Sequence, residues 1–247
     1  MPNANFESLL AKLEDRTATV GVIGLGYVGL PLAITSATRG LKTIGFDTDP
    51  KKMQMLSSGQ SPVDTVAKDA LTHVTDNGTF SWTTGFAQLS ECDVIVICVP
   101  TPLTRHREPD LSYIESTSRE IALHLSPSTL VSLESTTFPG TTDEVMTPIL
   151  ETSGLRAGVD FFAAFSPERE DPGNAHFNTA TIPKIVAGDG VEARKLAEVF
   201  YSIVVDKVVP VSSTRTAEAV KITENIFRAV NIAMVNELKV IYDAMNI

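Results

Sequence analysis

The chain has 247 residues, 43% of them hydrophobic, and carries 30 acidic against 20 basic side chains, for a formal net charge of −10. That is enough apolar sequence for one large globular domain, or for one and a half. The negative charge argues against binding to a nucleic-acid backbone, and two cysteines do not make a disulfide framework.

The N-terminal segment is polar and has no apolar signal core. No apolar run approaches the roughly 18 residues needed to span a bilayer. We therefore expect a cytoplasmic protein without a membrane partner. Apolar residues at helical spacing then predict a short amphipathic helix over residues 6–15, packed against the edge of the domain.

Strands and helices alternate through most of the chain. A β-branched run predicts a buried strand at residues 19–24, followed by a helix at 28–39 that ends near Gly40. The later strands are expected at 42–47, 93–99, 129–134, 161–165, 184–187 and 207–211, and the later helices from Asp49-Pro50 and at 64–72, 111–125, 141–152 and 190–203. This alternation predicts an α/β fold with a Rossmann-like, doubly wound, mainly parallel sheet.

A different pattern begins near residue 213. One helical signal runs from there to residue 245 without glycine or proline, and such a helix is roughly 50 Å long. The sequence therefore divides into a Rossmann-like domain at 1–212 and a long connecting helix at 213–247. Because the helix is apolar nearly all round, we expect it to be buried, as a connector and as the surface of a homodimer or higher homo-oligomer.

The turn between the first strand and its helix matches G-x-G-x-x-G, in the residues Gly24-Leu25-Gly26-Tyr27-Val28-Gly29. The first glycine permits the tight turn, the second lets the backbone approach a pyrophosphate, and the third lets helix and strand pack closely. The amide groups at the helix start then point at the phosphates. The alternative is a packing turn that holds no ligand.

An acidic side chain stands where the second strand ends. Asp47 lies at the distance where an acid bonds the ribose hydroxyls, and it would repel a 2′-phosphate. The pattern therefore predicts NAD, although Lys51 and Lys52 weaken the preference over NADP.

Two unusual loops follow neighbouring strands at the carboxyl edge of the sheet, where ligands of such sheets bind. In Val99-Pro100-Thr101-Pro102 the prolines fix the backbone and leave Thr101 as the polar contact. The second loop, residues 134–140, carries three hydroxyls in a row, including Ser135 and Thr136, which can bond ribose, the nicotinamide amide or a reacting water. A helix cap at Thr141 or Thr142 is the alternative for this loop.

A charged segment follows the strand at 161–165. Glu168 comes directly after Pro167 and should project from the strand end into the cleft, and it is followed by Arg169, Glu170 and Asp171. We assign Glu168 to the site, with Arg169 and Glu170 as substrate contacts. The alternative is a solvated turn.

Polar side chains interrupt one face of the long helix. Lys221 and Asn225 are four residues apart and share that face, Arg228 continues it, and Asn236 extends it imperfectly. A buried lysine stabilises an oxyanion, and an asparagine donates to the same oxygen. A surface ion pair of Lys221 with Glu218 or Glu224 is the alternative.

The cysteines and histidines do not form a site. Cys92 and Cys98 lie in or beside an apolar strand and are expected to be inert. The four histidines are scattered without a metal-binding spacing, so no metal is expected.

These motifs, in this order, resemble the UDP-glucose/GDP-mannose dehydrogenase family, through residues 24–31, 99–102, 134–140, 166–174 and 221–225. The amino-acid sequence is most similar to the bacterial UDP-N-acetylglucosamine 6-dehydrogenase branch in four segments: residues 134–142, 166–174, 182–184 and 227–232. The resemblance covers residues 19–247, and five motifs in register are far more specific than one.

The resemblance implies a four-electron oxidation. The C6 alcohol of a UDP-sugar gives a hydride to NAD, a cysteine captures the aldehyde as a thiohemiacetal, and a second NAD takes a hydride before water hydrolyses the thioester to a uronic acid. Lys221 and Asn225 would then stabilise the oxyanion, Thr136 and Glu168 would position water and substrate, and Asp47 and Lys52 would hold the adenosine ribose. The substrate contacts would be Glu168, Arg169, Glu170, Lys221, Asn225, Arg228 and Asn236.

One part of the family pattern is missing. In the family the cysteine and an aspartate lie in a second Rossmann-like domain after the long helix, and this sequence ends at Ile247. We therefore expect an N-terminal portion of a longer enzyme, which binds NAD but does not complete the reaction.

Several functions stay open at this point. UDP-N-acetylglucosamine is the favoured substrate, with UDP-N-acetylmannosamine, UDP-glucose, GDP-mannose or an N-acetylgalactosamine form as alternatives. A β-hydroxyacid dehydrogenase also combines a Rossmann domain with a catalytic lysine on a long helix, although the Glu168 segment speaks against it. A non-catalytic NAD-binding or dimerisation module is the third hypothesis.

Overall fold

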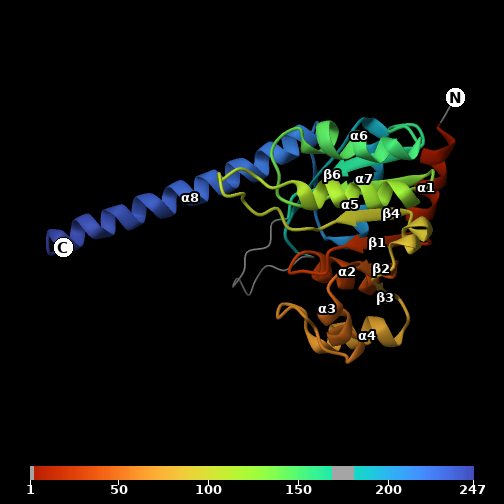
Figure 1. Ribbon diagram of the computed structural model, residues 1–247, viewed down its shortest axis with the longest axis horizontal. Helices are drawn as coiled ribbons and strands as arrows, with labels where there is room; N and C mark the ends of the chain where they lie inside the picture. The colour runs from red at the N-terminus through yellow and green to blue at the C-terminus, as the bar shows by residue number, and fades with distance from the viewer. Residues whose placement is uncertain (1–2, 169–180) are drawn as a thin grey trace.

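A twisted sheet forms the centre of the protein in the computed structural model, which describes residues 3–168 and 181–247 (Figure 1). Within these residues it has eight strands in the order β3-β2-β1-β4-β5-β6-β7-β8. The strands are β1 Thr19–Ile23, β2 Lys42–Phe46, β3 Phe80–Thr83, β4 Val94–Ile97, β5 Thr129–Leu133, β6 Phe161–Phe165, β7 Lys184–Gly188 and β8 Val208–Pro210. All neighbours pair in parallel except β6 and β7, which are antiparallel. The predicted α/β, doubly wound, mainly parallel fold is confirmed.

Each face of the sheet buries its own apolar core, because side chains alternate between the faces along a strand. Val94 and Val96 of β4 belong to one core, and Ile95 and Ile97 belong to the other. The first core is covered by α1 Ala4–Glu14, α2 Gly29–Thr38, α3 Pro50–Ser57, α4 Lys68–Asp76 and α7 Val191–Val204. The second is covered by η1 Phe86–Glu91, α5 Ser112–His124, the π-helical turn η2 Thr141–Met146 and α6 Thr147–Leu150, which continues into η3 Glu151–Ser153.

The structure differs from the expected elements in several places. Strand β3 and the short helix η1 were not predicted, and the helix expected at 64–72 lies at 68–76. The single helix expected at 141–152 is divided into η2, α6 and η3. Pro148 has no N–H for the carbonyl one turn earlier, so a regular α-helix cannot run through this segment.

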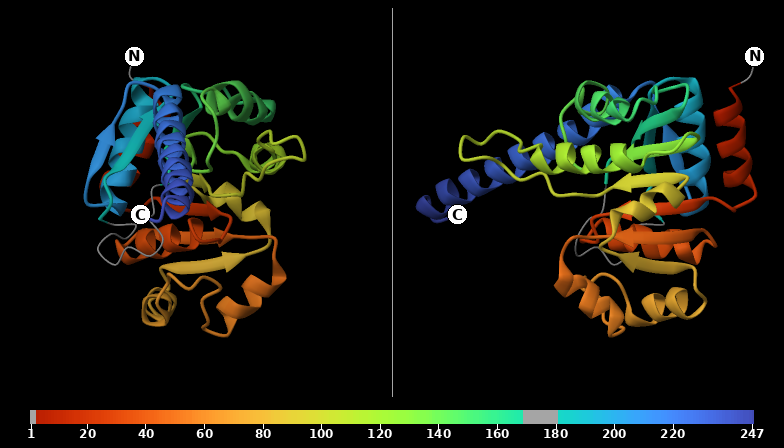
Figure 2. Two further views of the ribbon diagram at one scale, coloured as in Figure 1. Left: turned by 90° about the vertical axis from the view of Figure 1, so that its left-hand side faces the viewer. Right: turned by 45° about the vertical axis from the view of Figure 1, so that its right-hand side comes forward.

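The last helix, α8 Thr214–Ala244, leaves the domain and projects away from it (Figures 1 and 2). Its first turn is capped by the Ser213 side chain, which accepts a hydrogen bond from the amide of Thr216. The expectation that this helix is buried is wrong for most of its length in this chain. From Ile226 onward nearly every residue is exposed, because no other described segment packs against it.

None of the helices in residues 3–168 and 181–247 combines the length and the apolar character that crossing a membrane requires.

Candidate functional site

The carboxyl ends of β1, β2, β4 and β5 open onto a cleft of about 720 Å³. Ligands of open α/β sheets bind at this edge, where the strand order reverses between β1 and β4. The predicted cofactor residues that line the cleft are Gly24, Gly26, Tyr27, Val28, Asp47, Lys52, Val99, Pro100, Thr101, Ser135, Thr136 and Glu168. The others, Leu25, Gly29 and Pro102, do not line it. The structure therefore brings together residues from five separate segments.

The three glycines of the turn have different surroundings. Gly24 has φ +92°, and a Cβ built on it would lie 2.6 Å from the carbonyl oxygen of Cys98. A Cβ on Gly29 would lie 2.0 Å from the carbonyl oxygen of Gly24. A Cβ on Gly26 would meet nothing within 4 Å, although Gly26 lines the cleft. The fold thus requires glycine at 24 and 29, whereas at 26 the open space suits the close approach of a pyrophosphate.

The carboxylate of Asp47 is buried at the end of β2, beside the glycine turn. Its Oδ2 accepts hydrogen bonds from the amide of Leu25 at 2.8 Å and from Lys52 Nζ at 2.6 Å. Its Oδ1 accepts from the amide of Asp49 at 2.9 Å. Leu25 therefore holds Asp47 in place through its backbone amide, and Lys52 neutralises part of the Asp47 charge.

The loops that follow β4 and β5 are joined by hydrogen bonds in both directions. Thr101 Oγ1 donates to the carbonyl oxygen of Thr136 at 2.7 Å, and Ser135 Oγ donates to the carbonyl oxygen of Val99 at 2.6 Å. These two hydroxyls hold the loops together. The exposed side chain of Thr136 lines the cleft, whereas the neighbouring Thr137 hydroxyl is buried without a hydrogen-bond partner in the described residues.

A buried ionic network, missed by sequence reasoning, reaches the cleft through Glu134. Glu134 lines the cleft, and its Oε2 accepts from Lys184 Nζ at 3.0 Å while its Oε1 accepts from the hydroxyl of Tyr201 at 2.7 Å. The Tyr201 oxygen also lies 2.8 Å from Ser132 Oγ. Burial and the Glu134 carboxylate raise the pKa of Tyr201 well above its ordinary value, so the hydroxyl keeps its proton and donates it.

The long helix contributes Lys221 to the edge of this region. Lys221 Nζ donates to the backbone carbonyl oxygen of Glu168 and lies 3.5 Å from Glu168 Oε2. Both side chains are 12% exposed, so this is a largely buried contact, and the alternative of a surface pair between Lys221 and Glu218 is not found. Asn225 is half-buried one turn further along α8. Neither Lys221 nor Asn225 lines the cleft itself, and Lys221 reaches it only through Glu168.

The remaining predicted substrate contacts are not gathered at the cleft either. Arg228 and Asn236 are exposed on the projecting part of α8 and do not line it. Arg169 and Glu170 lie outside the described residues.

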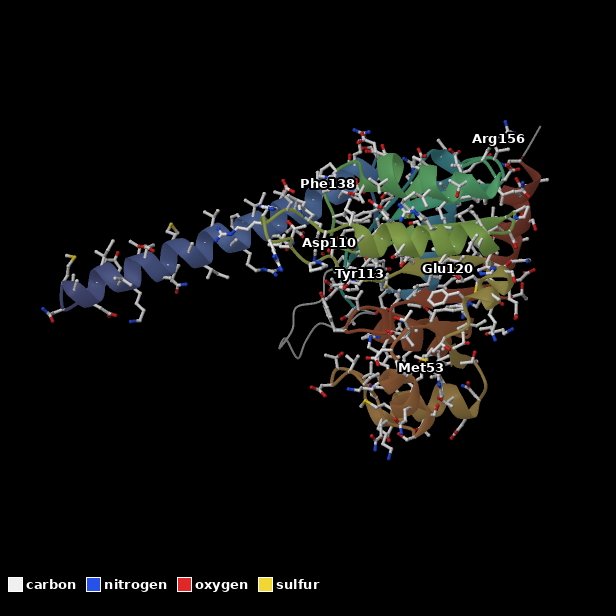
Figure 3. All side chains as sticks on the ribbon, viewed as in Figure 1. Met53, Asp110, Tyr113, Glu120, Phe138 and Arg156 are labelled. Atoms are coloured by element: carbon white, nitrogen blue, oxygen red, sulfur yellow. The ribbon has the colours of Figure 1, made fainter. Side chains whose placement is uncertain are left out.

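Helix α5 adds side chains that the sequence analysis did not select. Tyr113, Ser116 and Thr117 line the cleft, together with Phe86 of η1. Tyr113 lies near the start of α5 (Figure 3). The spacing of i, i+3 and i+4 places the three α5 residues on one helix face. That polar stripe on a helix that follows a cofactor-type loop was the available sequence signal.

The cysteines lie in apolar surroundings. Cys98 contributes to the cleft, and burial raises the pKa of its thiol well above the ordinary value. Burial also raises the pKa of Cys92 to about 12. Both thiols therefore stay protonated at neutral pH and are poor nucleophiles. In the described part of the chain no three His, Cys, Asp or Glu side chains cluster as metal ligands.

Comparison with known proteins gives the class of this fold and site. Residues 18–205 match the NAD binding domain of the UDP-glucose/GDP-mannose dehydrogenase family, and residues 215–247 match its central domain. The chain belongs to this family, and NAD is the cofactor of its Rossmann-like domain.

Individual relatives agree with this assignment. The chain is 36% identical to a UDP-N-acetyl-D-glucosamine 6-dehydrogenase of Pseudomonas aeruginosa over 92% of its length and 54% of the relative. It is 37% identical to a UDP-N-acetyl-D-mannosamine dehydrogenase of Pyrococcus horikoshii, over 88% and 52%. The crystal structure of an NDP-N-acetyl-D-galactosaminuronic acid dehydrogenase from Methanosarcina mazei Go1 superposes with a TM-score of 0.83 at 35% identity, covering 95% of this chain and 52% of that one. The chain thus spans about half the length of the relatives it matches.

The residues present fit this cofactor. The open space above Gly26 is a cradle that a side chain would fill, and the helix that starts beside it directs amide groups toward a phosphate. Asp47 offers acceptors to ribose hydroxyls, and the joined loops after β4 and β5 close the other side of the cleft.

Proposed function

We propose that this chain is the cofactor-binding part of an enzyme that oxidises the C6 alcohol of a UDP-N-acetylhexosamine to the uronic acid. The overall reaction consumes two NAD and one water and releases two NADH and two protons. NAD, when bound, supplies the hydride acceptor. Completion of the reaction requires a nucleophile that the two buried cysteines of this chain do not supply.

The observation that carries the proposal is the space above Gly26. Packing explains glycine at 24 and 29, whereas at position 26 the protein leaves room for a side chain beside the cleft, and a bound pyrophosphate explains why none is present. Together with Asp47 at the neighbouring strand end, this arrangement is that of a dinucleotide site.

The second half of the proposal assigns the reacting groups. Lys221 holds a positive charge beside Glu168 at the edge of the cleft, where an ammonium group stabilises the alkoxide that forms as the alcohol loses its proton. Asn225 donates to the same oxygen, and Thr136 and Glu168 orient the alcohol and a water. These are the groups that the family resemblance assigns to the same roles.

UDP-N-acetylglucosamine is the sugar nucleotide that we favour. The P. aeruginosa relative is named as a dehydrogenase of this sugar nucleotide. The sequence of the loop at residues 134–142 supports the same choice. UDP-N-acetyl-D-mannosamine is the second candidate, because a relative of equal similarity carries that name.

The proposal is tested on the whole gene product with a panel of UDP-sugars. We expect two NADH per sugar consumed, counted by absorbance at the NADH band, and the highest kcat/KM with UDP-N-acetylglucosamine. Calorimetry on the 247-residue chain is expected to show NAD binding without turnover. One NADH per sugar, or no heat with millimolar NAD on folded chain, contradicts the proposal.

A further inference from the structure

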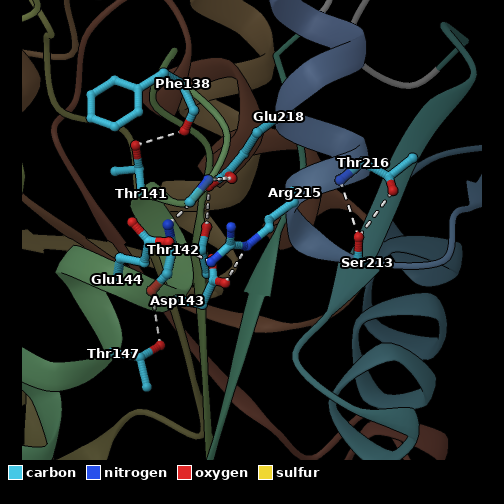
Figure 4. A network of polar contacts seen from close by, with 11 residues as sticks. Phe138, Thr141, Thr142, Asp143, Glu144, Thr147, Ser213, Arg215, Thr216 and Glu218 are labelled. Carbon is cyan, nitrogen blue, oxygen red and sulfur yellow. Dashed lines mark hydrogen bonds and ion pairs between the residues drawn. The ribbon is translucent and has the colours of Figure 1, made fainter.

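A completely buried carboxylate joins the long helix to the domain. Glu218 of α8 is 0% exposed. Its Oε2 accepts a hydrogen bond from the amide of Gly140 at 2.6 Å. Its Oε1 accepts from the amide of Thr142 at 2.9 Å and from Thr142 Oγ1 at 2.7 Å. Figure 4 shows the side chain pointing from α8 into this turn.

The partners of Glu218 are the first amides of η2, which has no capping side chain of its own. Gly140 has φ +104° and turns the chain out of the loop that follows β5. A carboxylate at such a helix start satisfies amides that would otherwise be unpaired. Glu218 therefore caps η2 from a segment 76 to 78 residues further along the chain.

A second contact holds the same turn of α8. Arg215 Nε donates to Asp143 Oδ2 at 2.7 Å, and its terminal nitrogen pairs with Glu144 (Figure 4). This ion pair is half-exposed and therefore contributes little to stability by itself. The buried hydrogen bonds of Glu218 are therefore the contact that fixes α8 against η2.

The hydrogen bonds of Glu218 join two segments, the loop after β5 and helix α8, and each segment carries a residue close to the cleft. Gly140 lies four residues after Thr136, whose carbonyl oxygen is bonded to Thr101. On the other side, Lys221 follows Glu218 by three residues on α8 and binds Glu168. One carboxylate thus sets the position of the hydroxyl loop relative to the lysine.

From this geometry we propose that Glu218 is a positioning residue for the reaction proposed above. It holds the loop of Ser135 and Thr136 and the Lys221 ammonium in one fixed arrangement, without touching substrate or cofactor. The inference rests on the proposed function for its catalytic meaning, but the arrangement itself is measurable without turnover.

The test compares Glu218→Ala, Glu218→Gln and the unmodified chain. Lysine acylation, followed residue by residue with mass spectrometry, reports how well Lys221 is held, and calorimetry reports the Kd for NAD. We expect Glu218→Ala to make Lys221 react several-fold faster and to weaken NAD binding roughly tenfold, because the loop of Ser135 and Thr136 is no longer held in its binding position. Glu218→Gln keeps one acceptor and is expected to lie between the two.

A matched variant separates positioning from stability. Leu13→Ala removes a buried side chain of α1, a helix that packs against α7 and contributes no residue to the cleft lining, and it should lower the melting temperature. Lys184 is buried and paired with Glu134, so it is acylated only when the protein unfolds. Faster acylation of Lys184 therefore reports global unfolding.

The outcomes are distinct. If Glu218→Ala behaves like Leu13→Ala, with Lys221 still protected and the Kd for NAD unchanged, Glu218 is only structural and the inference is wrong. If the unmodified chain does not bind NAD, the proposed function fails, while the protection of Lys221 still decides whether Glu218 positions it.

Discussion

Gly26 and Gly29 stand three residues apart in one turn, yet a side chain at each would meet different surroundings. At position 29 an added Cβ would overlap the carbonyl oxygen of Gly24 at 2.0 Å, so the turn itself would have to move. At position 26, which lines the cleft, the added atom would meet no other atom within 4 Å. Residue-scale geometry therefore separates a glycine needed for folding from a glycine needed for a ligand.

This difference predicts opposite behaviour of two single variants. Gly26→Ala should leave the melting temperature nearly unchanged and weaken NAD binding at least tenfold, because the methyl group occupies the place of the pyrophosphate. Gly29→Ala should lower the melting temperature by several degrees, because the clash destabilises the turn. Differential scanning fluorimetry and calorimetry measure both effects. Equal NAD affinity of Gly26→Ala and the unmodified chain would contradict the assignment.

At the scale of elements, one buried ion pair ties three of them together. Glu134 follows β5, Lys184 begins β7 and Tyr201 lies on α7, and all three are buried. Burying two charges is costly, and their attraction offsets the cost only while both are present with their hydrogen bonds. The network therefore holds the end of β5 in place, directly before the loop of Ser135 and Thr136.

Breaking this pair from one side should be more harmful than replacing both partners. Lys184→Met leaves the Glu134 charge buried and unpaired, and we expect a loss of about 3–5 kcal/mol in the free energy of unfolding. The double variant Glu134→Leu/Lys184→Met removes both charges and should recover most of that loss. Urea denaturation at pH 7 measures both. A double variant as unstable as the single one would show that the pair stabilises the fold by itself.

At the scale of the whole molecule, α8 is the unusual feature. It projects away from the sheet (Figure 2) and exposes large apolar side chains, among them Ile226, Phe227, Val230 and Ile241. Many large apolar side chains exposed along one helix are unfavourable in water and are typical of an interaction surface. Self-association through this helix, as expected from the sequence, would cover it.

The prediction for the isolated chain is a concentration-dependent dimer. Sedimentation velocity should show a species of twice the chain mass of 26.6 kDa at micromolar concentration. Phe227→Glu/Val230→Glu places charges on the apolar surface and should return the chain to a monomer. Lys239→Gln, on the same helix and paired with Asp243 at the surface, is the matched control and should stay dimeric. A monomer at all concentrations before any substitution would contradict the prediction.

Sequence reasoning succeeded where the deciding interactions are local. The strand, turn and helix around Gly24, the acid at Asp47 and the long helix from residue 213 all follow from spacing along the chain. It was wrong where a distant or irregular contact intervenes. Pro148 interrupts the single helix expected at 141–152. The antiparallel direction of β7 was not specified by the prediction of a mainly parallel sheet, because no periodicity reveals strand direction.

By itself, the sequence determined the class of fold, the family resemblance and the kind of cofactor, because each depends on residues a few positions apart. The tertiary structure alone decided which charges meet. Lys184 reaches Glu134 across 50 positions, Lys221 reaches Glu168 across 53 and Glu218 reaches Gly140 across 78. Such contacts depend on how strands and helices pack in space, and one charged residue has many possible partners in a chain until that packing selects one.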